Sequence, residues 1–156
     1  MKKIYLAGGC FWGVEEYFSR IEGVTDTTVG YANSNIKSPT YEQVCTGDTN
    51  AAEALYINYD QNVISLDEIL DYYFGIIDPI SVNKQGGDTG TQYRTGIYYT
   101  DKSDLKTIKN HVERIQVSYD EKVAVEVMAL DNFYNAEEYH QDYLKKNPNG
   151  YCHIDL

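Results

Sequence analysis

Along the 156 residues, short segments with the periodicity of β-strands are mixed irregularly with amphipathic segments, and no repeat or flexible linker separates them. Apolar residues at every second position predict strands, and apolar residues three or four apart predict helices. The predicted strands cover residues 3–7, 24–31, 53–59, 93–99 and 123–129. The predicted helices cover residues 11–23, 41–45, 65–74, 101–115 and 136–145. This irregular order favours an α+β fold, a single-domain two-layer sandwich in which helices flank a mixed β-sheet.

Length and charge limit what the chain can bind. Its length fits a single domain over residues 1–156, and we expect a mobile C-terminal tail from about residue 147, where an Asn-Pro-Asn-Gly turn begins. A net charge of −11 argues against nucleic acid as a partner. No apolar run approaches the ~20 residues that span a bilayer, so no membrane partner is expected. The apolar run at residues 4–7 is too short for a signal peptide, which predicts a cytoplasmic protein.

The three cysteines, Cys10, Cys45 and Cys152, are far apart in the sequence. An odd number without a CxxC motif argues against a disulfide framework and against a zinc ribbon. We therefore expect a mixture of buried and reactive thiols. Cys45 is interpreted as structural. Cys152, after the Pro/Gly turn, is either an exposed tail thiol or a mobile thiol that can reach another sulfur.

Residues 8–13, with the sequence GGCFWG, join a predicted strand to a predicted helix. Cys10 then lies at the helix start, where unpaired backbone N–H groups and the helix dipole favour the thiolate. A pKa of ~5–7 and rapid alkylation near neutral pH are expected for such a thiol. The alternative is that Cys10 is a small buried hydrophobic residue. Phe11 fits the apolar face of the helix, whereas Trp12 does not and is interpreted as a pocket wall.

Several polar residues are candidates for proton transfer. Burial of Glu53 at the start of its strand would raise its pKa and make it a general acid, although solvent exposure is the simpler interpretation. Tyr41 and Tyr93 flank loops and could donate phenolic protons. Asp88 lies in the long polar loop 76–92, where an Asx turn is the simpler role.

One Glu-x-x-His pair, Glu137 and His140, lies on the last predicted helix. A di-iron site needs two such helices and two further glutamates, so no metal site is expected.

Residues 9–13, GCFWG, resemble the signature of the peptide methionine sulfoxide reductase A family. The likeness continues in order along nearly the whole chain, at VGYA (29–32), PTYEQVCTG (39–47), AEA (52–54), GDTGTQYR (87–94), EYHQ (138–141) and KNPNGYC (146–152). Each motif is weak alone, but their common order makes the match specific.

This resemblance implies an enzyme that reduces the S form of methionine sulfoxide, in oxidised proteins or peptides and as the free amino acid. Cys10 would attack the substrate sulfur and become a sulfenic acid. Glu53, in its acid form, would hold and protonate the sulfoxide oxygen together with the hydroxyls of Tyr41 and Tyr93.

The other family positions would bind the substrate and recycle the thiol. Phe11 and Trp12 would cage the substrate methyl group, Asp88 would orient the substrate, and Glu137 would join the hydrogen-bond network behind the site. Cys152 would then convert the sulfenic acid into a Cys10–Cys152 disulfide, which thioredoxin reduces. The resemblance implies no cofactor.

The sequence departs from the family pattern at three places. Asn50 and Ala51 stand where many relatives have Gly-His, and Ile77 stands where relatives often have His before Asp-Pro. The sequence ends at Leu156 without the Gly-rich tail that carries a second resolving cysteine in some relatives. Recycling is therefore expected to depend on Cys152 alone.

Two other functions stay open at this point. A thiol peroxidase would form the same Cys10 sulfenic acid from a peroxide, although an apolar cage at Phe11 and Trp12 favours a methyl-bearing substrate. A non-catalytic acidic binding module would keep Cys10 in its core, with slow alkylation at alkaline pH only.

Overall fold

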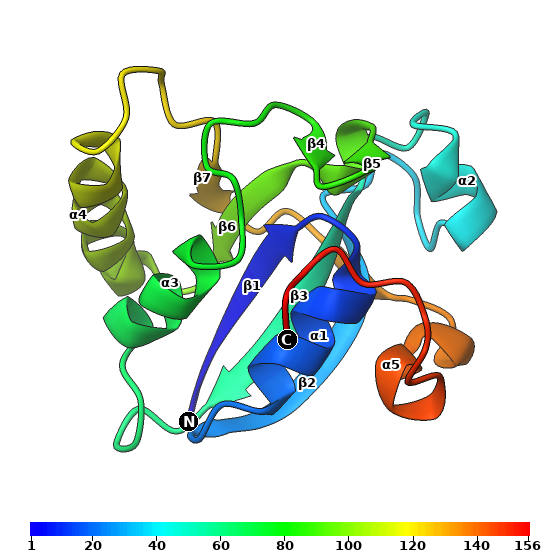
Figure 1. The fold of residues 1–156 in the computed structure, drawn as a ribbon, viewed down its shortest axis with the longest axis horizontal. Coiled ribbons are helices and arrows are strands. Elements are labelled where there is room, and N and C mark those ends of the chain that lie inside the picture. Colours follow the sequence, from blue (N-terminus) through cyan, green and yellow to red (C-terminus); the bar gives the residue numbers. More distant parts are fainter.

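The computed structural model describes all 156 residues, and its centre is a six-stranded mixed sheet in the order β7-β6-β1-β3-β2-β8 (Figure 1). The strands are β1 (Lys2–Gly8), β2 (Val24–Ala32), β3 (Ala52–Tyr59), β6 (Thr95–Tyr99), β7 (Glu126–Ala129) and β8 (Phe133–Asn135). Neighbouring strands are antiparallel, except that β6 and β7 are parallel. A separate hairpin pairs β4 (Lys84–Gln85) with β5 (Asp88–Thr89).

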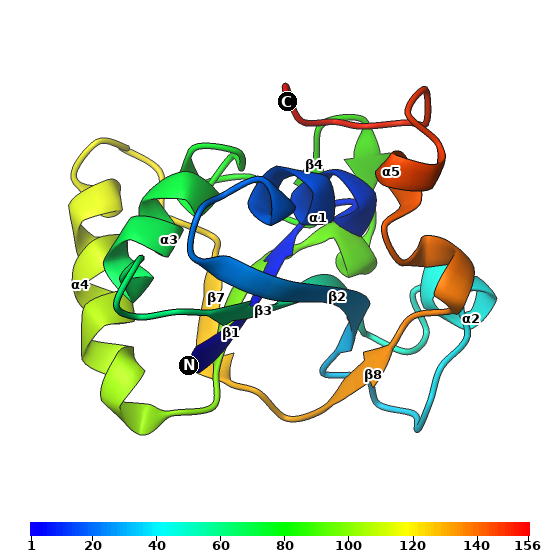
Figure 2. The same ribbon diagram turned by 90° about the horizontal axis from the view of Figure 1, so that it is seen from below.

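Helices flank this sheet. Helix α1 covers the strands β1 to β3, while α3 and α4 pack together beside it, as the two ribbon views show (Figures 1 and 2). The helices are α1 (Phe11–Ser19), α2 (Tyr41–Cys45), α3 (Leu66–Phe74), α4 (Leu105–Gln116) and α5 (Tyr143–Lys146). Short 3₁₀ turns are η1 (Thr91–Tyr93), η2 (Lys102–Asp104) and η3 (Glu138–His140). The predicted α+β fold with a mixed sheet and flanking helices is confirmed. No helix has the length and apolar character needed to cross a membrane.

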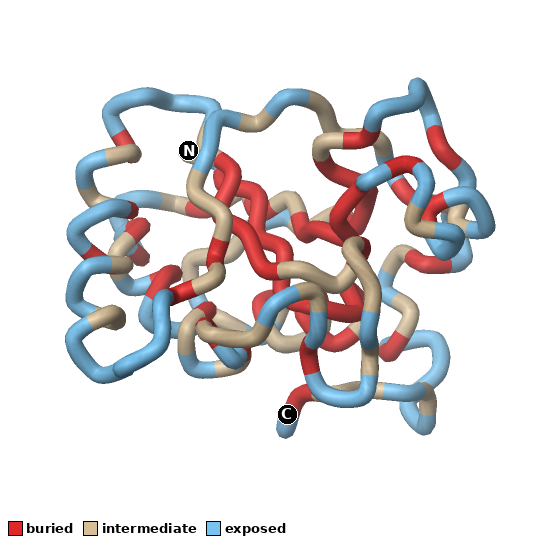
Figure 3. The backbone as a smooth tube through the Cα atoms, turned by 90° about the horizontal axis from the view of Figure 1, so that it is seen from above, coloured by how far each residue is buried: buried red, intermediate tan, exposed pale blue.

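The core lies between the sheet and its helices, and the central strands β1 and β3 are buried over most of their length (Figure 3). Tyrosines contribute here as hydrogen-bonding core residues. The hydroxyl of Tyr73, on α3, donates to the Ala7 carbonyl over 2.6 Å and accepts from the Gly96 N–H over 3.1 Å. A fully buried phenol thus ties α3 to two strands at once, with its polar atom satisfied.

The predicted start of the third helix is also confirmed in detail. Ser65 accepts a hydrogen bond from the Glu68 N–H, and the Glu68 carboxylate accepts one from the Ser65 N–H. These reciprocal bonds form the capping box that the sequence indicates.

The prediction of one helix over residues 136–145 is wrong. The segment instead contains η3 and α5, separated by Asp142 in the left-handed conformation with φ of 52°. The Gln141 side chain accepts from the Val29 N–H and donates to the Val29 carbonyl, so it pairs with the backbone of β2 in place of a strand. The Asp142 N–H donates to the carboxylate of Glu15 over 2.7 Å. Tertiary hydrogen bonds therefore override the helical pattern.

Two further predictions need correction. The region 76–92 is not wholly loop, because it contains the β4–β5 hairpin and the start of η1. Tyr93 belongs to η1 and not to the strand that follows, and β7 begins only at Glu126.

The register of the sheet brings three chain segments to one end. Antiparallel pairing matches Leu6 with Leu55 and Gly8 with Thr95. The end of β1, the start of β3 and the start of β6 therefore lie side by side. Cys10 follows the first, Glu53 lies in the second, and Tyr93 precedes the third.

Candidate functional site

A sharp turn places Cys10 at the start of α1. Gly9 has φ of 89°, and a Cβ at this position would lie 2.7 Å from the Cβ of Gln85, so only glycine fits. Cys10 is the N-cap residue of α1, as predicted, and the residue is 7% exposed. The thiol is therefore placed at the helix N-terminus but is nearly enclosed by protein.

The predicted low pKa of Cys10 is wrong for this closed site. Burial, followed by the nearby Glu53 carboxyl, raises the pKa of the Cys10 thiol, and the Trp12 backbone N–H lowers it by less. Desolvation thus outweighs the helix N-terminus. Slow alkylation at neutral pH is therefore expected of this closed site as well as of a non-catalytic module.

Glu53 is buried and not exposed at its strand end, with 1% of the residue accessible to solvent. Its Oε1 accepts a hydrogen bond from the Phe11 N–H over 3.2 Å, and its Oε2 has no hydrogen-bond partner. Burial raises the pKa of Glu53 to about 8, and the charge of Asp88 acts in the same direction. At neutral pH Glu53 is therefore a protonated acid with one oxygen free to donate.

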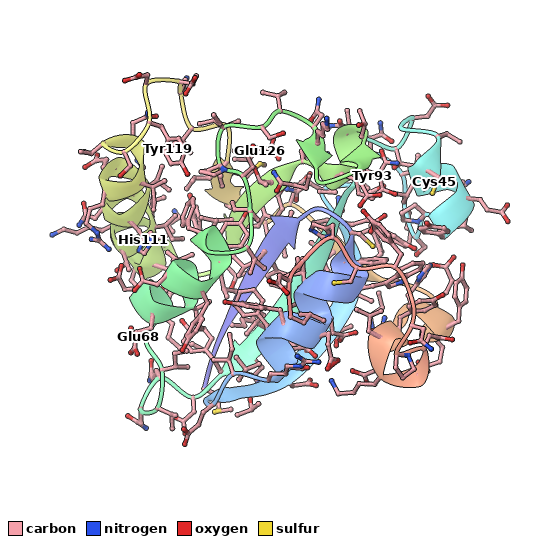
Figure 4. The ribbon with its side chains drawn as sticks, viewed as in Figure 1. Cys45, Glu68, Tyr93, His111, Tyr119 and Glu126 are labelled. Atoms are coloured by element: carbon pink, nitrogen blue, oxygen red, sulfur yellow. The ribbon has the colours of Figure 1, made fainter.

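Two tyrosine hydroxyls come to the same place from different elements. Tyr41 is the first residue of α2, which begins with a capping box from Thr40, and Tyr93 ends η1. Burial, then a hydrogen bond to Cys45, raises the pKa of Tyr41, and burial, then the Glu53 charge, raises the pKa of Tyr93. Both phenols stay protonated at neutral pH. Figure 4 shows Tyr93 and Cys45 at the same end of the molecule.

An aromatic wall stands beside the thiol. The Trp12 indole N–H donates to Nδ1 of His140 over 2.9 Å, and the Trp12 ring stacks on Tyr143 with centroids 3.8 Å apart. Phe11 is buried, with its ring centroid 5.2 Å from that of His140 and 5.8 Å from that of Tyr31. Trp12 is half-buried, and its role as a pocket wall stays a prediction.

Glu137 links Tyr31 on β2 to the start of α2 by hydrogen bonds, although it does not touch the thiol. Its carboxylate accepts from the Tyr31 hydroxyl over 2.7 Å and from the Tyr41 N–H over 2.9 Å. Burial acts to raise the pKa of Glu137, but these hydrogen bonds outweigh it and the pKa is lowered. An ionised Glu137 thereby fixes the start of α2 and the position of Tyr41.

The C-terminal segment crosses the N-terminal end of α1, as Figure 1 shows in red. Asp88, on β5, accepts from the Tyr151 hydroxyl over 2.9 Å. A Cβ at Gly13 would lie 2.7 Å from Sγ of Cys152, so this thiol packs directly on α1 one turn after Cys10. Cys152 is half-buried, and its proximity to Cys10 contributes to the raised pKa of that thiol. The mobility predicted for the tail stays a prediction.

Sequence reasoning missed part of this arrangement. The sequence suggests His140 only as a metal ligand, whereas the residue is fully buried and its Nδ1 accepts a hydrogen bond from the Trp12 indole. His153 is suggested by the sequence only as a metal ligand with Cys10 or Cys45, without zinc spacing to support it, whereas its ring bonds to the Gly8 carbonyl. Tyr143 is marked by no spacing. Cys45 is exposed on α2, beside Tyr41, where the sequence suggested only a structural role.

Taken together, the site holds a thiol, a neutral carboxylic acid and two phenol donors beside an aromatic wall, with a second thiol close by. Such a set can deliver a sulfur nucleophile to an electrophilic centre and donate hydrogen bonds to an oxygen on which negative charge develops. No cluster of three or more His, Cys, Asp or Glu side chains could hold a metal ion.

Comparison with known proteins identifies the family. Residues 2–156 match the family model described as peptide methionine sulfoxide reductase. The chain is 63% identical over 156 residues to the peptide methionine sulfoxide reductase MsrA of Clostridium perfringens, covering 100% of this chain and 99% of that protein.

Solved structures agree with this result. Mxr1 from Saccharomyces cerevisiae in reduced form superposes with a TM-score of 0.93 at 42% identity, covering 99% of this chain and 91% of that one. Mxr1 in complex with Trx2 superposes with a TM-score of 0.66 at 31% identity, over 91% of this chain and 84% of that one. The resemblance first recognised in GCFWG therefore extends over the whole chain, which belongs to the peptide methionine sulfoxide reductase family as an enzyme of the MsrA type.

Proposed function

We propose that this methionine sulfoxide reductase acts on the S form of the sulfoxide, in oxidised proteins and peptides and as the free amino acid, by direct attack of Cys10 on sulfur. The observation that carries the proposal is the neutral Glu53 acid beside Cys10, whose Oε2 has no partner within the protein. A sulfoxide oxygen is a strong hydrogen-bond acceptor, and it would satisfy this buried donor.

In the first step, the Cys10 sulfur forms a bond to the sulfoxide sulfur while oxygen receives a proton from Glu53. The phenols of Tyr41 and Tyr93 donate hydrogen bonds to the same oxygen as charge develops on it. Transfer of that oxygen to Cys10 releases methionine and leaves a sulfenic acid. The thiol proton ends on the products through Glu53, so the sulfoxide is reduced by two electrons and Cys10 is oxidised by two.

Substrate position depends on the aromatic wall. Phe11 and Trp12 would form the apolar cage for the methyl group of the sulfoxide, which favours methionine over a peroxide. Asp88 would orient the substrate near the tail residue Tyr151, to which it is hydrogen-bonded in this structure. Glu137 supports the reaction indirectly, because it holds the backbone of Tyr41.

Recycling would proceed through Cys152. Its thiol attacks the Cys10 sulfenic acid, forming a disulfide and water, and the dithiol of thioredoxin then reduces the disulfide. The contact of Cys152 with Gly13, one helical turn from Cys10, supports this assignment. The yeast relative Mxr1 has been crystallised with Trx2, which supports thioredoxin as the reductant. Three free cysteines without a CxxC motif fit a reducing compartment, and we propose the cytoplasm.

The test uses reduced protein with no external reductant. It is mixed separately with the S and R forms of methionine sulfoxide, and both methionine released and thiols lost are counted. About one methionine per chain from the S form, with two thiols lost, is expected from the chemistry above.

Other outcomes separate the steps of the proposal. One methionine with a single thiol lost would keep the reductase step and remove Cys152 from it. Methionine from the R form alone would overturn the stereochemical assignment. Cys10→Ser serves as the control, and any turnover above background in this variant would exclude Cys10 as the nucleophile.

A further inference from the structure

His153, the residue after Cys152, is anchored in a slot between two parts of the fold. Its Nε2–H donates to the carbonyl of Gly8 over 3.0 Å, at the end of β1. A Cβ added to Gly9 would lie 3.0 Å from the His153 ring, and a Cβ added to Gly86 would lie 3.0 Å from its Cβ. Two glycines, one on each side, therefore leave room for this side chain.

The surroundings of the His153 ring favour its neutral form, which can still donate a hydrogen bond. Burial lowers the pKa of His153, and its Nδ1 is buried without a hydrogen-bond partner. The hydrogen bond to Gly8, and then the charge of Asp88, act to raise the pKa, but burial outweighs both. A neutral ring with the proton on Nε2 can donate this bond to the Gly8 carbonyl.

Neighbouring anchors restrict the rest of the segment. Tyr151 is hydrogen-bonded to Asp88, and Ile154 is buried with its Cδ1 3.3 Å from a Cβ placed at Gly13. Tyr151 is itself exposed, so the two enclosed contacts are those of His153 and Ile154. They lie directly after Cys152, and they hold its Sγ against α1.

We propose that His153 is a positioning residue for Cys152: its hydrogen bond to the Gly8 carbonyl docks the tail and holds the Cys152 thiol beside Cys10. This inference rests on the proposed role of Cys152 and gives a reason why Cys152 lies near Cys10. Gly8 lies two residues before Cys10, so the anchor and the nucleophile belong to the same turn.

The step that His153 serves is disulfide formation. Sγ of Cys152 attacks the sulfur of the Cys10 sulfenic acid, the S–S bond forms and the S–O bond breaks. The departing hydroxide takes the proton of the Cys152 thiol and leaves as water. Holding the attacking thiol near its target removes the entropic cost of a search by a free tail.

The experiment separates the first step from the second in one mixing. Reduced His153→Ala and His153→Gln variants are mixed with methionine S-sulfoxide, and methionine release and loss of the second thiol are followed over time. Asp155→Asn, two residues further along the same tail and exposed, is the matched control. Methionine release reports whether each variant is folded and competent.

His153→Ala is expected to release methionine at the parental rate but to lose the second thiol about tenfold more slowly, the scale of one hydrogen bond with its packing. The glutamine amide can donate to the Gly8 carbonyl, so His153→Gln should recover most of the rate. An unchanged second step in His153→Ala, an equal slowing of both steps, or no recovery in His153→Gln would each overturn the proposal.

A Cys152→Ser arm distinguishes this inference from the function on which it rests. If that variant still loses two thiols and is recycled by thioredoxin, the assignment of Cys152 itself fails, whatever His153 does. If it loses one thiol only, Cys152 stands and the His153 variants decide the positioning role.

Discussion

The backbone N–H of Phe11 donates a hydrogen bond to Oε1 of Glu53, 3.2 Å away across the end of the sheet. One carboxyl oxygen is thereby held by the first turn of α1, next to the Cys10 thiol, while the other is left without a partner. The acid and the nucleophile are consequently positioned by the same piece of backbone.

The methionine-releasing step should lose rate as the pH rises through about 8, because burial raises the pKa of Glu53 to that value and the acid form is the proton donor. Glu53→Gln keeps a hydrogen-bond donor and should cost far less activity than Cys10→Ser, while losing this alkaline decline. Assays that quench the reaction at set times and measure the methionine released, between pH 6 and ~9.5, check both points. An undiminished rate in Glu53→Ala would remove Glu53 from the reaction.

Stability should fall over a related pH range, because the folded protein also favours the acid form of Glu53. The native Glu53 keeps its proton up to a pKa of about 8, whereas an unfolded chain releases it near the ordinary value of 4.5. The free energy of unfolding contributed by this group therefore falls between these two pH values, by at most about 1.4 kcal/mol per pH unit. Glu53→Gln should gain stability over the parent from pH 5 to pH 8 in urea unfolding. A constant difference at both pH values would contradict the raised pKa.

Cys10 should be a slow nucleophile toward small alkylating agents at neutral pH, since burial raises the pKa of its thiol. At pH 7, iodoacetamide is expected to label Cys10 at least tenfold more slowly in the native protein than in urea, where its pKa is ordinary. Peptide mass spectrometry resolves it from the exposed Cys45. Faster labelling in the native state would restore the low pKa that the helix start alone suggests.

Gly13→Ala tests the docked tail from the side of α1. A Cβ there would lie 2.7 Å from Sγ of Cys152, so the tail must move, although alanine is the better helix former by about 1 kcal/mol. Methionine release should persist while loss of the second thiol slows several-fold. Arg20→Ala, at the exposed far end of the helix, is the control. Parental kinetics in Gly13→Ala would show that this contact does not hold Cys152 for reaction.

Local patterns predicted much of this fold because most elements agree with their own sequence. Ser65 and Glu68 signal a helix start that needs no tertiary contact, and the strand and helix around Cys10 follow from two glycines and a hydrophobic period. The broken segment at Asp142 could not be predicted in this way. Its conformation depends on Gln141 pairing with β2 and on Glu15 of α1, which are distant in the sequence.

The candidate site also combines features that local sequence predicts with features that depend on the complete fold. The placement of Cys10 at a helix N-terminus follows from local sequence, but its raised pKa depends on how deeply other segments bury it. Burial of Glu53 also depends on the complete sheet, so neither pKa could be derived from spacing. His153 lies in a slot made by Gly9 and Gly86, and only the folded chain brings these together.

The pairing of Glu53 with Tyr31 across β3 and β2 makes the chemistry sensitive to a slip of one position. Successive side chains of a strand point to opposite faces, so a deletion within β3 would turn the acid away from α1 while Cys10 stayed in place. Such a protein would keep its nucleophile and lose its proton donor. Insertions and deletions can therefore accumulate in the loops between strands, but the number of residues in β2 and β3 at this end of the sheet must stay the same.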